Sequence, residues 1–542
     1  MTQTAVSKNI QEWLEKIARL SYVRRIWEKD ASLWTKDPAG RKEAGSRLGW
    51  LTCVKKMKEE AGTLSSFSEE VRAQGFSHVV LLGMGGSSLA SEVFQTVFSG
   101  RPGYPALVVL DSTDPARIQD IENKIDIQKS LFIVSSKSGG TIELVSLFKY
   151  FFEKVKSFKN EKAGEHFAAI TDPGTPLEEL GKRLGFRRIF PAPEDVGGRF
   201  SALTYFGLVP ASLIGVDVQK ILESAEKAME DSSPGIPISD NAAALLGVQM
   251  AVLAEEGRDK LTIVTSNTLE SFGDWAEQLI AESTGKEGLG IIPVVREPLG
   301  GAEAYGEDRF FVALLLEPDD NAALLRRLGG LEEAGHPVLI FKMKEKTDLG
   351  AEFFRWEMAT AIACALLKVN AFDQPDVQAA KDSTKVILKK VEGGGKLSVI
   401  ESSTSLESLR ELIDPEDYIG ILAFLPDRPE IKNKLLDLQA AIRDLTKKAV
   451  TLGIGPRYLH STGQLHKGGP NTGIFILITA AHAGDLAVPG DKFSFAELEL
   501  AQATGDLEAL EQKGRRVVHV RLPDLSPESL DSLCAGIKSA FR

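Results

Sequence analysis

The chain has 542 residues, of which 43% are hydrophobic and 26% charged, and its formal net charge is −12. This length allows about two to four domains, and the composition is that of an ordinary globular protein. The acidic balance argues against a surface that binds nucleic acid or anionic membranes, because such a surface needs a basic face. A bound phosphate group is still allowed, since a few local cations can hold it.

The sequence has the features of a cytoplasmic protein. Its cysteines, Cys53, Cys364 and Cys534, are far apart and form neither a metal-ligand spacing nor a disulfide framework. The first residues have no charged segment followed by an apolar run, so they do not predict a signal peptide. No apolar stretch is long enough to predict a membrane span. We therefore expect a cytoplasmic location.

Residues 1–44 are predicted to form an N-terminal helical segment. Apolar and charged positions alternate at helical spacing over residues 8–28, with Trp13, Ile17 and Leu20 on one face. We expect this helix to pack on the first α/β domain.

Residues 45–210 are predicted to form a first α/β domain. Short apolar runs follow one another as "HVVLLG", "ALVVLD", "SLFIVSS", "HFAAITD" and "RRIFPAP". Helical segments such as "SEVFQTVFSG" separate them. Continuous apolar strands that alternate with helices indicate a doubly wound parallel sheet, covered on both faces.

The same pattern restarts twice. Residues 211–394 contain the strand-like runs "KLTIVTSN", "GIIPVV", "RFFVALLLE" and "HPVLIFKM", and residues 395–542 contain "YIGILAFLP", "AVTLGIG", "GIFILITA" and "RRVVHVRLP". The glycine-rich "VEGGGKLSVIESS" between them predicts a linker or turn. The predicted fold class is therefore α/β, with two doubly wound parallel-sheet domains and a C-terminal α/β segment.

Two loops of the first domain suit an anion. "GMGGSSLA" at 83–90 places glycines and serines between a strand and a helix, so the backbone and the helix N-terminus can approach negative charge. A tight structural turn is the alternative interpretation. "SSKSGGT" at 135–141 adds three hydroxyls and a lysine before another helix, which suits a phosphate monoester. A helix N-cap with a spare lysine is the alternative there.

Five segments, "GMGGSSLA", "SSKSGGTIE", "DVGGRFSALTYFG", "AESTGK" and "NAFDQPDVQAAK", together resemble the phosphoglucose isomerase family of the sugar-isomerase (SIS) fold. The resemblance runs from about residue 75 to about residue 385. The last third is similar to the C-terminal part of bacterial members that are often fused behind a transaldolase. The family interconverts glucose 6-phosphate and fructose 6-phosphate in glycolysis and gluconeogenesis, without a metal or organic cofactor.

The resemblance also implies site residues. Glu282 corresponds to the base that moves a proton between C2 and C1, with Arg199 beside the reacting oxygens and Lys381 in the F-D-Q…K motif. The implied substrate-binding and phosphate-binding residues are Gly86, Ser87, Ser136, Lys137, Ser138, Thr141, Gln278 and Gln374.

The ring-opening histidine of the family normally lies between the glutamate and the F-D-Q motif, where this sequence has only His336. A better match to the family pattern is "YLHSTGQLHKGG", further along the chain. We assign ring opening to His460, and His466 to substrate binding as the second candidate. Their spacing of six is not that of a helical metal-ligand pair, so we predict no metal.

The residue types suit an aldose–ketose isomerase without the family name. Such an enzyme needs a phosphate anchor, a carboxylate base, a cation for the enediolate oxygens and an acid–base group that opens the ring. By composition Glu277 and Glu287 are as suitable as Glu282, and only the motif selects Glu282. Two alternatives remain: a regulatory sensor of sugar phosphates, which needs no base, and an isomerase for another sugar phosphate. The expected partners are a sugar phosphate and a second copy in a homodimer, with neither nucleic acid nor membrane.

Overall fold

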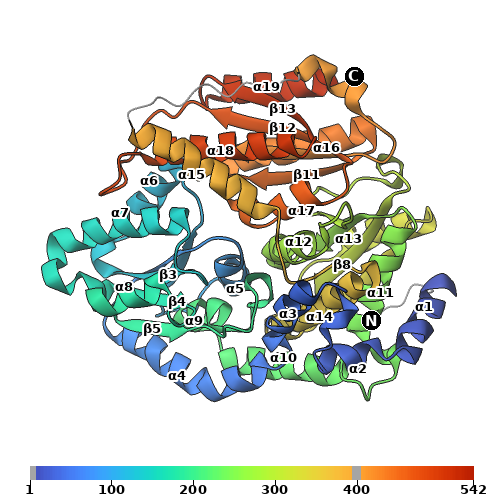
Figure 1. Ribbon diagram of the computed structural model, residues 1–542, viewed down its shortest axis with the longest axis horizontal. Coiled ribbons are helices and arrows are strands. Elements are labelled where there is room, and N and C mark those ends of the chain that lie inside the picture. Colours follow the sequence, from blue (N-terminus) through green and yellow to red (C-terminus); the bar gives the residue numbers. More distant parts are fainter. Residues whose placement is uncertain (1–7, 394–404, 542) are drawn as a thin grey trace.

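The protein is described by a computed structural model over residues 8–393 and 405–541, apart from the side chains of residues 379, 380 and 407. Within this range the chain forms three sheets, and every strand pair in them is parallel. The part that bears the first sheet lies on the left of Figure 1, the second at lower right and the third at the top. The predicted α/β class is therefore confirmed.

The strands coincide with the predicted apolar runs. They are β1 His78–Leu82, β2 Ala106–Leu110, β3 Ser130–Ser135, β4 Phe167–Thr171, β5 Arg188–Pro191, β6 Lys260–Thr265, β7 Ile292–Val294, β8 Arg309–Leu316, β9 Val338–Met343, β10 Tyr418–Phe424, β11 Ala449–Ile454, β12 Gly473–Ala480 and β13 Arg516–Leu522.

Helices connect and cover these strands. They are α1 Lys8–Arg19, α2 Tyr22–Trp27, α3 Pro38–Gly45, α4 Cys53–Ala73, α5 Leu89–Phe98, α6 Pro115–Lys124, α7 Ile142–Lys159, α8 Pro176–Leu184, α9 Tyr205–Leu213, α10 Val218–Asp231, α11 Ala242–Glu255, α12 Glu270–Thr284, α13 Ala322–Glu333, α14 Leu349–Leu367, α15 Val377–Glu392, α16 Pro429–Thr446, α17 Gly463–Gly468, α18 Phe495–Gln512 and α19 Pro527–Ala540. Short 3-10 helices are named below where they matter.

All three sheets are built in the same order. They run β2-β1-β3-β4-β5, β7-β6-β8-β9 and β11-β10-β12-β13, so in each the first strand lies between the second and the third. The chain therefore adds the second strand on one side of the first strand and then the third strand on its other side. In parallel sheets such a change of side leaves a crevice at the carboxyl ends of the first and third strands, where ligands bind. In the first sheet the crevice lies between the loops after β1 and β3, the two loops selected from the sequence.

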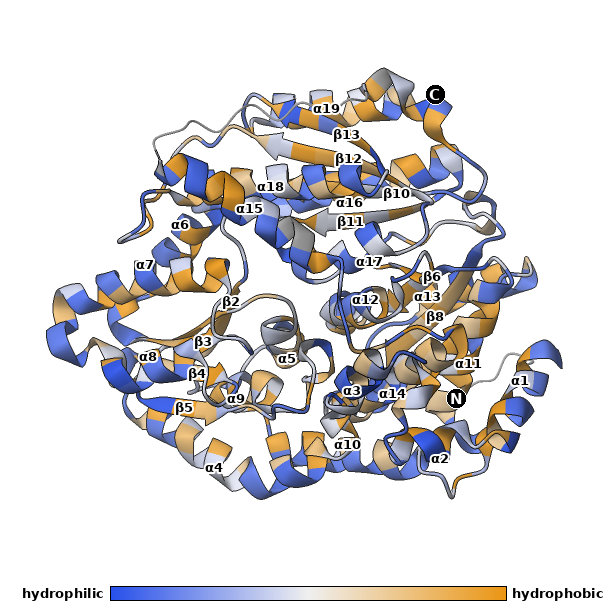
Figure 2. Ribbon diagram, viewed as in Figure 1, coloured by the Kyte–Doolittle hydropathy of each residue, from blue (hydrophilic) through white to orange (hydrophobic). Residues whose placement is uncertain are grey.

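Each strand sends alternate side chains to opposite faces, as its apolar sequence requires. On β1, Val79 and Leu81 join one buried cluster, whereas Val80 and Leu82 join another with residues of α6 and α7. Figure 2 shows the hydrophobic colour concentrated on the strands, while many helices are two-coloured. Helices therefore cover both faces of the sheet.

The N-terminal segment differs from its prediction in two ways. The helix is interrupted at Ser21, whose φ of 54° is left-handed, and Leu20 is 45% exposed instead of buried with Ile17. The segment also packs on the second α/β part: the Trp34 indole Nε1 donates to the carbonyl of Ala361 in α14, at 2.8 Å. α1 contacts α11, which belongs to the same part. The expected packing on the first domain is therefore wrong, because α1 packs against α11 and Trp34 against α14.

Each sheet lies inside one of the predicted ranges 45–210, 211–394 and 395–542. The exact boundaries remain predictions. The predicted glycine-rich linker, at 391–403, lies mostly outside the described residues. Its first two residues are the last two of α15, which ends at Glu392. Among the helices that the structure describes, none is long and apolar enough to cross a membrane.

Candidate functional site

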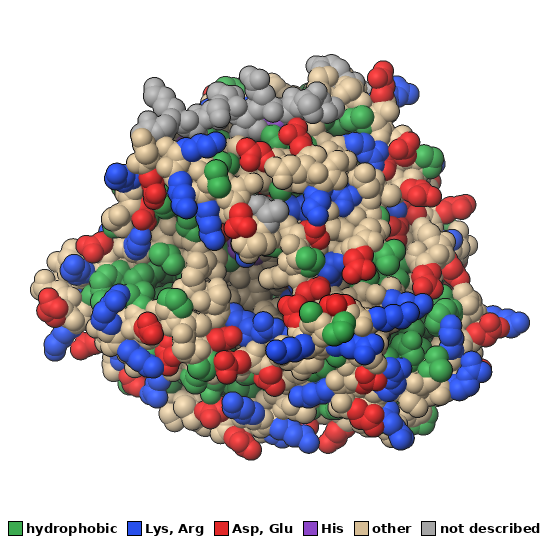
Figure 3. All heavy atoms as spheres, in the orientation of Figure 1, with side chains coloured by type: hydrophobic (Ala, Val, Ile, Leu, Met, Phe, Trp, Pro, Cys, Tyr) green, Lys and Arg blue, Asp and Glu red, His purple; other side chains and the backbone are tan. Residues whose placement is uncertain are grey.

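A cavity of about 210 Å³ lies where the first and third sheet-bearing parts meet α15. Figure 3 shows that this face of the molecule is hollowed near its centre. The walls come from the loop after β3, from α7, α15, α17 and α18, and from the 3-10 helix η12 (Arg457–His460). The polar side chains of the wall that matter below are Ser138, Thr141, Glu143, Lys381, His460 and Gln502.

The loop after β3 is folded around its own hydroxyl groups. The Ser136 Oγ accepts a hydrogen bond from the backbone N–H of Gly139 at 3.1 Å and lies 3.3 Å from the Thr141 Oγ1. Thr141 is the N-cap residue of α7, yet its hydroxyl caps no backbone N–H there. The hydroxyls of Ser138 and Thr141 and the helix N-terminus therefore line the cavity together, an arrangement suited to a phosphate.

Lys137, which the resemblance placed among the phosphate binders, points elsewhere. Its ammonium lies 2.7 Å from an Asp172 carboxylate oxygen and donates to the carbonyls of Pro193 and Glu194. The structure therefore brings the hydroxyls of the loop to the cavity without this ammonium. The lysines of the cavity wall are instead Lys381 and Lys385 on α15 and Lys467 on α17.

The two glycines after β1 allow three segments of backbone to meet. A Cβ at Gly86 would lie 2.3 Å from the carbonyl oxygen of Gly198, next to Arg199. A Cβ at Gly85, whose φ is +54°, would lie 2.5 Å from the carbonyl oxygen of His460. Side chains at these positions would push the Arg199 and His460 segments away from the loop. Close packing of protein segments thus explains this glycine pair.

One face of α12 carries the predicted base. Glu282 and Gln278 are four residues apart and so lie on the same face. The Glu282 carboxylate is 6% exposed and its Oε1 lies 3.2 Å from the Arg199 Nη1. The Gln278 Nε2 donates both to the Glu282 Oε2 at 3.1 Å and to the carbonyl of His460 at 2.7 Å. The base, its cation and the histidine segment are therefore held as one unit. Glu282, Arg199 and Gln278 do not line the cavity, so this unit reaches it through His460.

Arg199 is held in place by the segment that carries the F-D-Q sequence. Its Nη2 donates to the carbonyls of Ala371 at 3.0 Å and Asp373 at 2.7 Å. Lys286, which is buried, lies 2.9 Å from the Asp373 carboxylate. Burial, followed by the nearby Arg199 charge, lowers the pKa of Lys286 to about 8. The sequence did not single out Lys286, although it ends the quoted segment "AESTGK".

His460 has a carboxylate partner. Its Nε2 lies 2.8 Å from the Glu143 Oε1, which also accepts a hydrogen bond from the Gln502 Nε2 at 2.7 Å. Burial acts to raise the pKa of the Glu143 carboxyl, but His460 and then Lys381 outweigh it, so this pKa lies below its usual value. A carboxylate that fixes the ring of a histidine is a common arrangement for an acid–base group. The sequence analysis gave no role to Glu143, although it ends the segment "SSKSGGTIE".

The remaining predicted residues, Gln374, Ser87 and His466, do not line the cavity. Gln374 is exposed and lies outside the cavity wall, and Ser87 takes part through its carbonyl, which accepts from the Ser135 hydroxyl. His466 is 2% exposed, and its ring packs 4.9 Å from that of Phe475. Burial, followed by neighbouring cations, holds the pKa of His466 well below its usual value. The structure does not bring His466 to the cavity.

Within the described residues, Asp114, His482 and Glu499 offer ligand atoms within 4.8 Å of one another, close enough for a metal ion. The His482 Nε2 faces Glu499 at 2.9 Å, and its Nδ1 faces Asp114 at 3.8 Å. Burial acts to lower the pKa of His482, but Glu499 and Asp114 outweigh it and raise it. Burial also raises the pKa values of the Asp114 and Glu499 carboxyls, that of Glu499 to about 7, so the three groups form a buried hydrogen-bonded cluster. It lies apart from the cavity wall described above.

The chain is similar to known proteins in sequence and in fold. The family model described as phosphoglucose isomerase matches residues 51–295. A probable glucose-6-phosphate isomerase of Methanococcus maripaludis is 28% identical over 63% of this chain and 84% of its own. A glucose-6-phosphate isomerase of Prochlorococcus marinus is 30% identical over 64% of this chain and 76% of its own.

A solved structure shares the fold. The crystal structure of a hypothetical protein from Thermus thermophilus covers 70% of this chain and 96% of its own, with a TM-score of 0.59 and 24% sequence identity. The sequence relatives and the family model identify this chain as a member of the phosphoglucose isomerase family.

Proposed function

We propose that the chain interconverts glucose 6-phosphate and fructose 6-phosphate by ring opening and proton transfer between C2 and C1. The observation that carries this proposal is the buried Glu282 carboxylate, held by Arg199 and Gln278. Gln278 also binds the segment that carries His460. A base, a cation and an acid–base group are thus fixed relative to one another, beside a loop suited to phosphate.

Glu282 is the base in this proposal. It removes the proton from C2 of the opened sugar and returns it to C1, while Arg199 stabilises the negative oxygens of the enediolate. Arg199 suits this role because its Nη2 is held by two backbone carbonyls while its Nη1 faces Glu282. A preorganised cation needs little rearrangement as negative charge develops in the transition state.

His460 opens the ring. Glu143 occupies its Nε2, so Nδ1 is the nitrogen that exchanges a proton with a bound sugar. Gln502 holds Glu143 from the other side. Such a pair fixes both the tautomer and the orientation of the imidazole.

The phosphate binds at the loop after β3. Ser138 and Thr141 donate hydrogen bonds, the N-terminus of α7 adds its dipole, and Lys381 supplies a positive charge from α15. Ser136 supports the loop from within, and Lys137 contributes to its fold through Asp172. We assign no step to a metal or organic cofactor, since each chemical requirement is met by one of these side chains.

His460 contacts Glu143 and Gln278 of its own chain, and from these contacts we propose that the site is complete in a single subunit. A homodimer remains a prediction, which sedimentation or light scattering would check. We also propose a cytoplasmic location, from the unpaired Cys53, Cys364 and Cys534.

The test is a coupled assay from fructose 6-phosphate to glucose 6-phosphate on metal-free protein, with the Glu282→Gln variant beside it. Activity in the wild type and loss in the variant would support the proposal and the base together. Binding of fructose 6-phosphate without turnover in the wild type would favour a regulatory sensor. Turnover of another sugar phosphate alone would favour an isomerase of different selectivity.

A further inference from the structure

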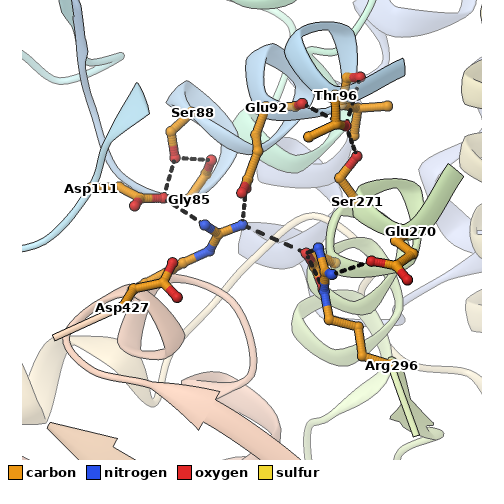
Figure 4. A network of polar contacts seen from close by, with 12 residues as sticks. Gly85, Ser88, Glu92, Thr96, Asp111, Glu270, Ser271, Arg296 and Asp427 are labelled. Carbon is orange, nitrogen blue, oxygen red and sulfur yellow. Dashed lines mark hydrogen bonds and ion pairs between the residues drawn. The ribbon is translucent and has the colours of Figure 1, made fainter. Parts of the chain in front are cut away.

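A second arginine fastens the segment that carries His460. Arg457 is the first residue of η12, three positions before His460, and its side chain is 19% exposed. Its guanidinium forms an ion pair with Glu92 on α5, lies 3.3 Å from an Asp111 oxygen after β2, and lies 4.0 Å from Asp274 on α12. Figure 4 shows Glu92 and Asp111 converging on this point from two elements of the first α/β part.

The contacts of η12 follow the face of α12 that carries the base. Asp274, Gln278 and Glu282 are spaced four residues apart, so they lie one above another on that face. Arg457 reaches Asp274, and the carbonyl of His460 accepts from Gln278 one turn further on. Glu282 follows after another turn. Two contacts, one at each end of η12, therefore set the position of His460 along the helix that bears the base.

The anchoring carboxylates are themselves held. Asp274 accepts hydrogen bonds from the Arg296 Nε at 2.8 Å and Nη2 at 2.6 Å. The Ser88 hydroxyl donates to Asp111 at 3.2 Å, and Ser88 belongs to the glycine loop against which His460 packs. The far end of each ion pair is thus fixed to the first or second α/β part.

The charges explain why an arginine is needed. Burial acts to lower the pKa of the Arg457 guanidinium, but Asp111 and Glu92 outweigh it and hold this pKa well above its usual value. Burial raises the pKa of Asp111, against the lowering effect of Arg457. Several carboxylates thus meet in a largely buried place, where removal of the cation leaves their charges uncompensated. A planar guanidinium can bind more than one of them at once, which an ammonium does less well.

We propose that Arg457 is a positioning residue for the reaction: by binding Glu92, Asp111 and Asp274 it holds the η12 segment where His460 can open the sugar ring. The Arg457 guanidinium is taken up by three carboxylates, so we assign it a role through His460 and not through contact with the sugar phosphate. This inference rests on the proposed function.

The test compares Arg457→Ala and Arg457→Lys with Arg428→Ala. Arg428 is a matched control, because it also joins the third α/β part to the first, through Asp120 on α6, but does not belong to η12 and binds none of the three carboxylates that hold Arg457. Two substrates are used: glucose 6-phosphate, and its 4,5-dideoxy analogue, which lacks the hydroxyls that close the ring. We expect Arg457→Ala to lower kcat about 10- to 100-fold with glucose 6-phosphate and less than about threefold with the analogue. Arg457→Lys should recover part of this loss.

Arg428→Ala should change the turnover of both substrates by the same factor. Equal losses on both substrates in Arg457→Ala, or no loss, would overturn the proposal. If Arg457→Ala does not fold, the Arg457→Lys variant decides by the same comparison. A readout without turnover is the imidazole 15N resonance of His460, which we expect to shift in Arg457→Lys but not in Arg428→Ala. A wild type that leaves glucose 6-phosphate unchanged would contradict the proposed function, and this resonance would still test the positioning role.

Discussion

The first and third sheets have the same strand order but hold their functional groups in different ways. The hydroxyl loop of the first sheet follows β3 at the crevice of the sheet, and Ser136 stabilises it from within. His460 follows β11, an edge strand of the third sheet, and its partners Glu143 and Gln278 come from the other two α/β parts. The hydroxyl loop is therefore local, whereas the ring-opening group depends on contacts with both other α/β parts.

The largest effect is expected at the proposed base, Glu282, which lies on α12 of the second α/β part. Glu282→Gln should lower kcat by about 10²–10⁴-fold, because the amide cannot accept the C2 proton. Binding of fructose 6-phosphate should survive, since neither the loop nor η12 is changed. Steady-state kinetics and calorimetry on the same preparations measure the two quantities. Near-normal turnover would remove Glu282 as the base.

A smaller, substrate-dependent effect is expected in the third part. His460→Ala should lower kcat about 10²-fold with glucose 6-phosphate and much less with the 4,5-dideoxy analogue, because only the first needs ring opening. Glu143→Gln, which keeps the shape but removes the charge beside His460, should show the same selectivity with a smaller loss. Equal losses on both substrates would indicate a binding role for His460.

Substitutions in the hydroxyl loop of the first α/β part should weaken substrate binding. Ser138→Ala and Thr141→Ala each remove one hydrogen bond to a charged phosphate, worth about 1.5–3 kcal/mol, so KM should rise about tenfold or more while kcat changes little. Lys137→Met is the control, because its ammonium is bound to Asp172 and lies off the cavity wall. Its KM should change less than about threefold. A larger rise in KM for Lys137→Met than for Thr141→Ala would reverse this assignment.

The smallest expected effect is on the pH dependence of the unfolding free energy, through the buried Glu277 on α12. Burial, followed by the nearby Asp274 charge, raises the pKa of the Glu277 carboxyl from 4.5 to about 8. A carboxyl whose pKa is raised by folding binds its proton more tightly in the folded state, so its stabilisation is present at low pH and is lost as pH rises through this window. The unfolding free energy of the wild type should therefore fall between about pH 5 and pH 8 relative to that of Glu277→Gln.

Urea unfolding of both proteins at several pH values measures this difference. The exposed Glu287→Gln is the control, and its difference from the wild type should stay constant with pH. A constant difference for Glu277→Gln as well would mean that Glu277 is ionised in the folded protein.

The sequence predicted what depends on neighbouring residues. The apolar runs predicted the strands, and the alternation of strands and helices predicted parallel sheets. The hydroxyl and glycine loops fell at the crevice of the first sheet because strand ends and loop chemistry are local properties. The family motif selected Glu282, which the structure pairs with Arg199, from three glutamates of similar composition.

Contacts between distant segments could not be predicted in this way. Glu143 and His460 are 317 residues apart, and Arg457 and Glu92 are 365 apart, so no local pattern connects them. The direction of Lys137 depends on Asp172 after the next strand, and the packing of α1 depends on the surface of α11. These features follow from tertiary packing, which a single sequence does not encode in its spacing.

The most direct test of the central claim is complementation between two inactive variants. Glu282→Gln and His460→Ala chains carrying different tags are co-expressed, and any mixed complex is purified through both tags and assayed with glucose 6-phosphate. A site complete in one chain predicts no more activity than that of the two variants alone, since every chain lacks one group. Recovery of a substantial fraction of wild-type activity would show that His460 of one chain serves Glu282 of another, and would contradict the account.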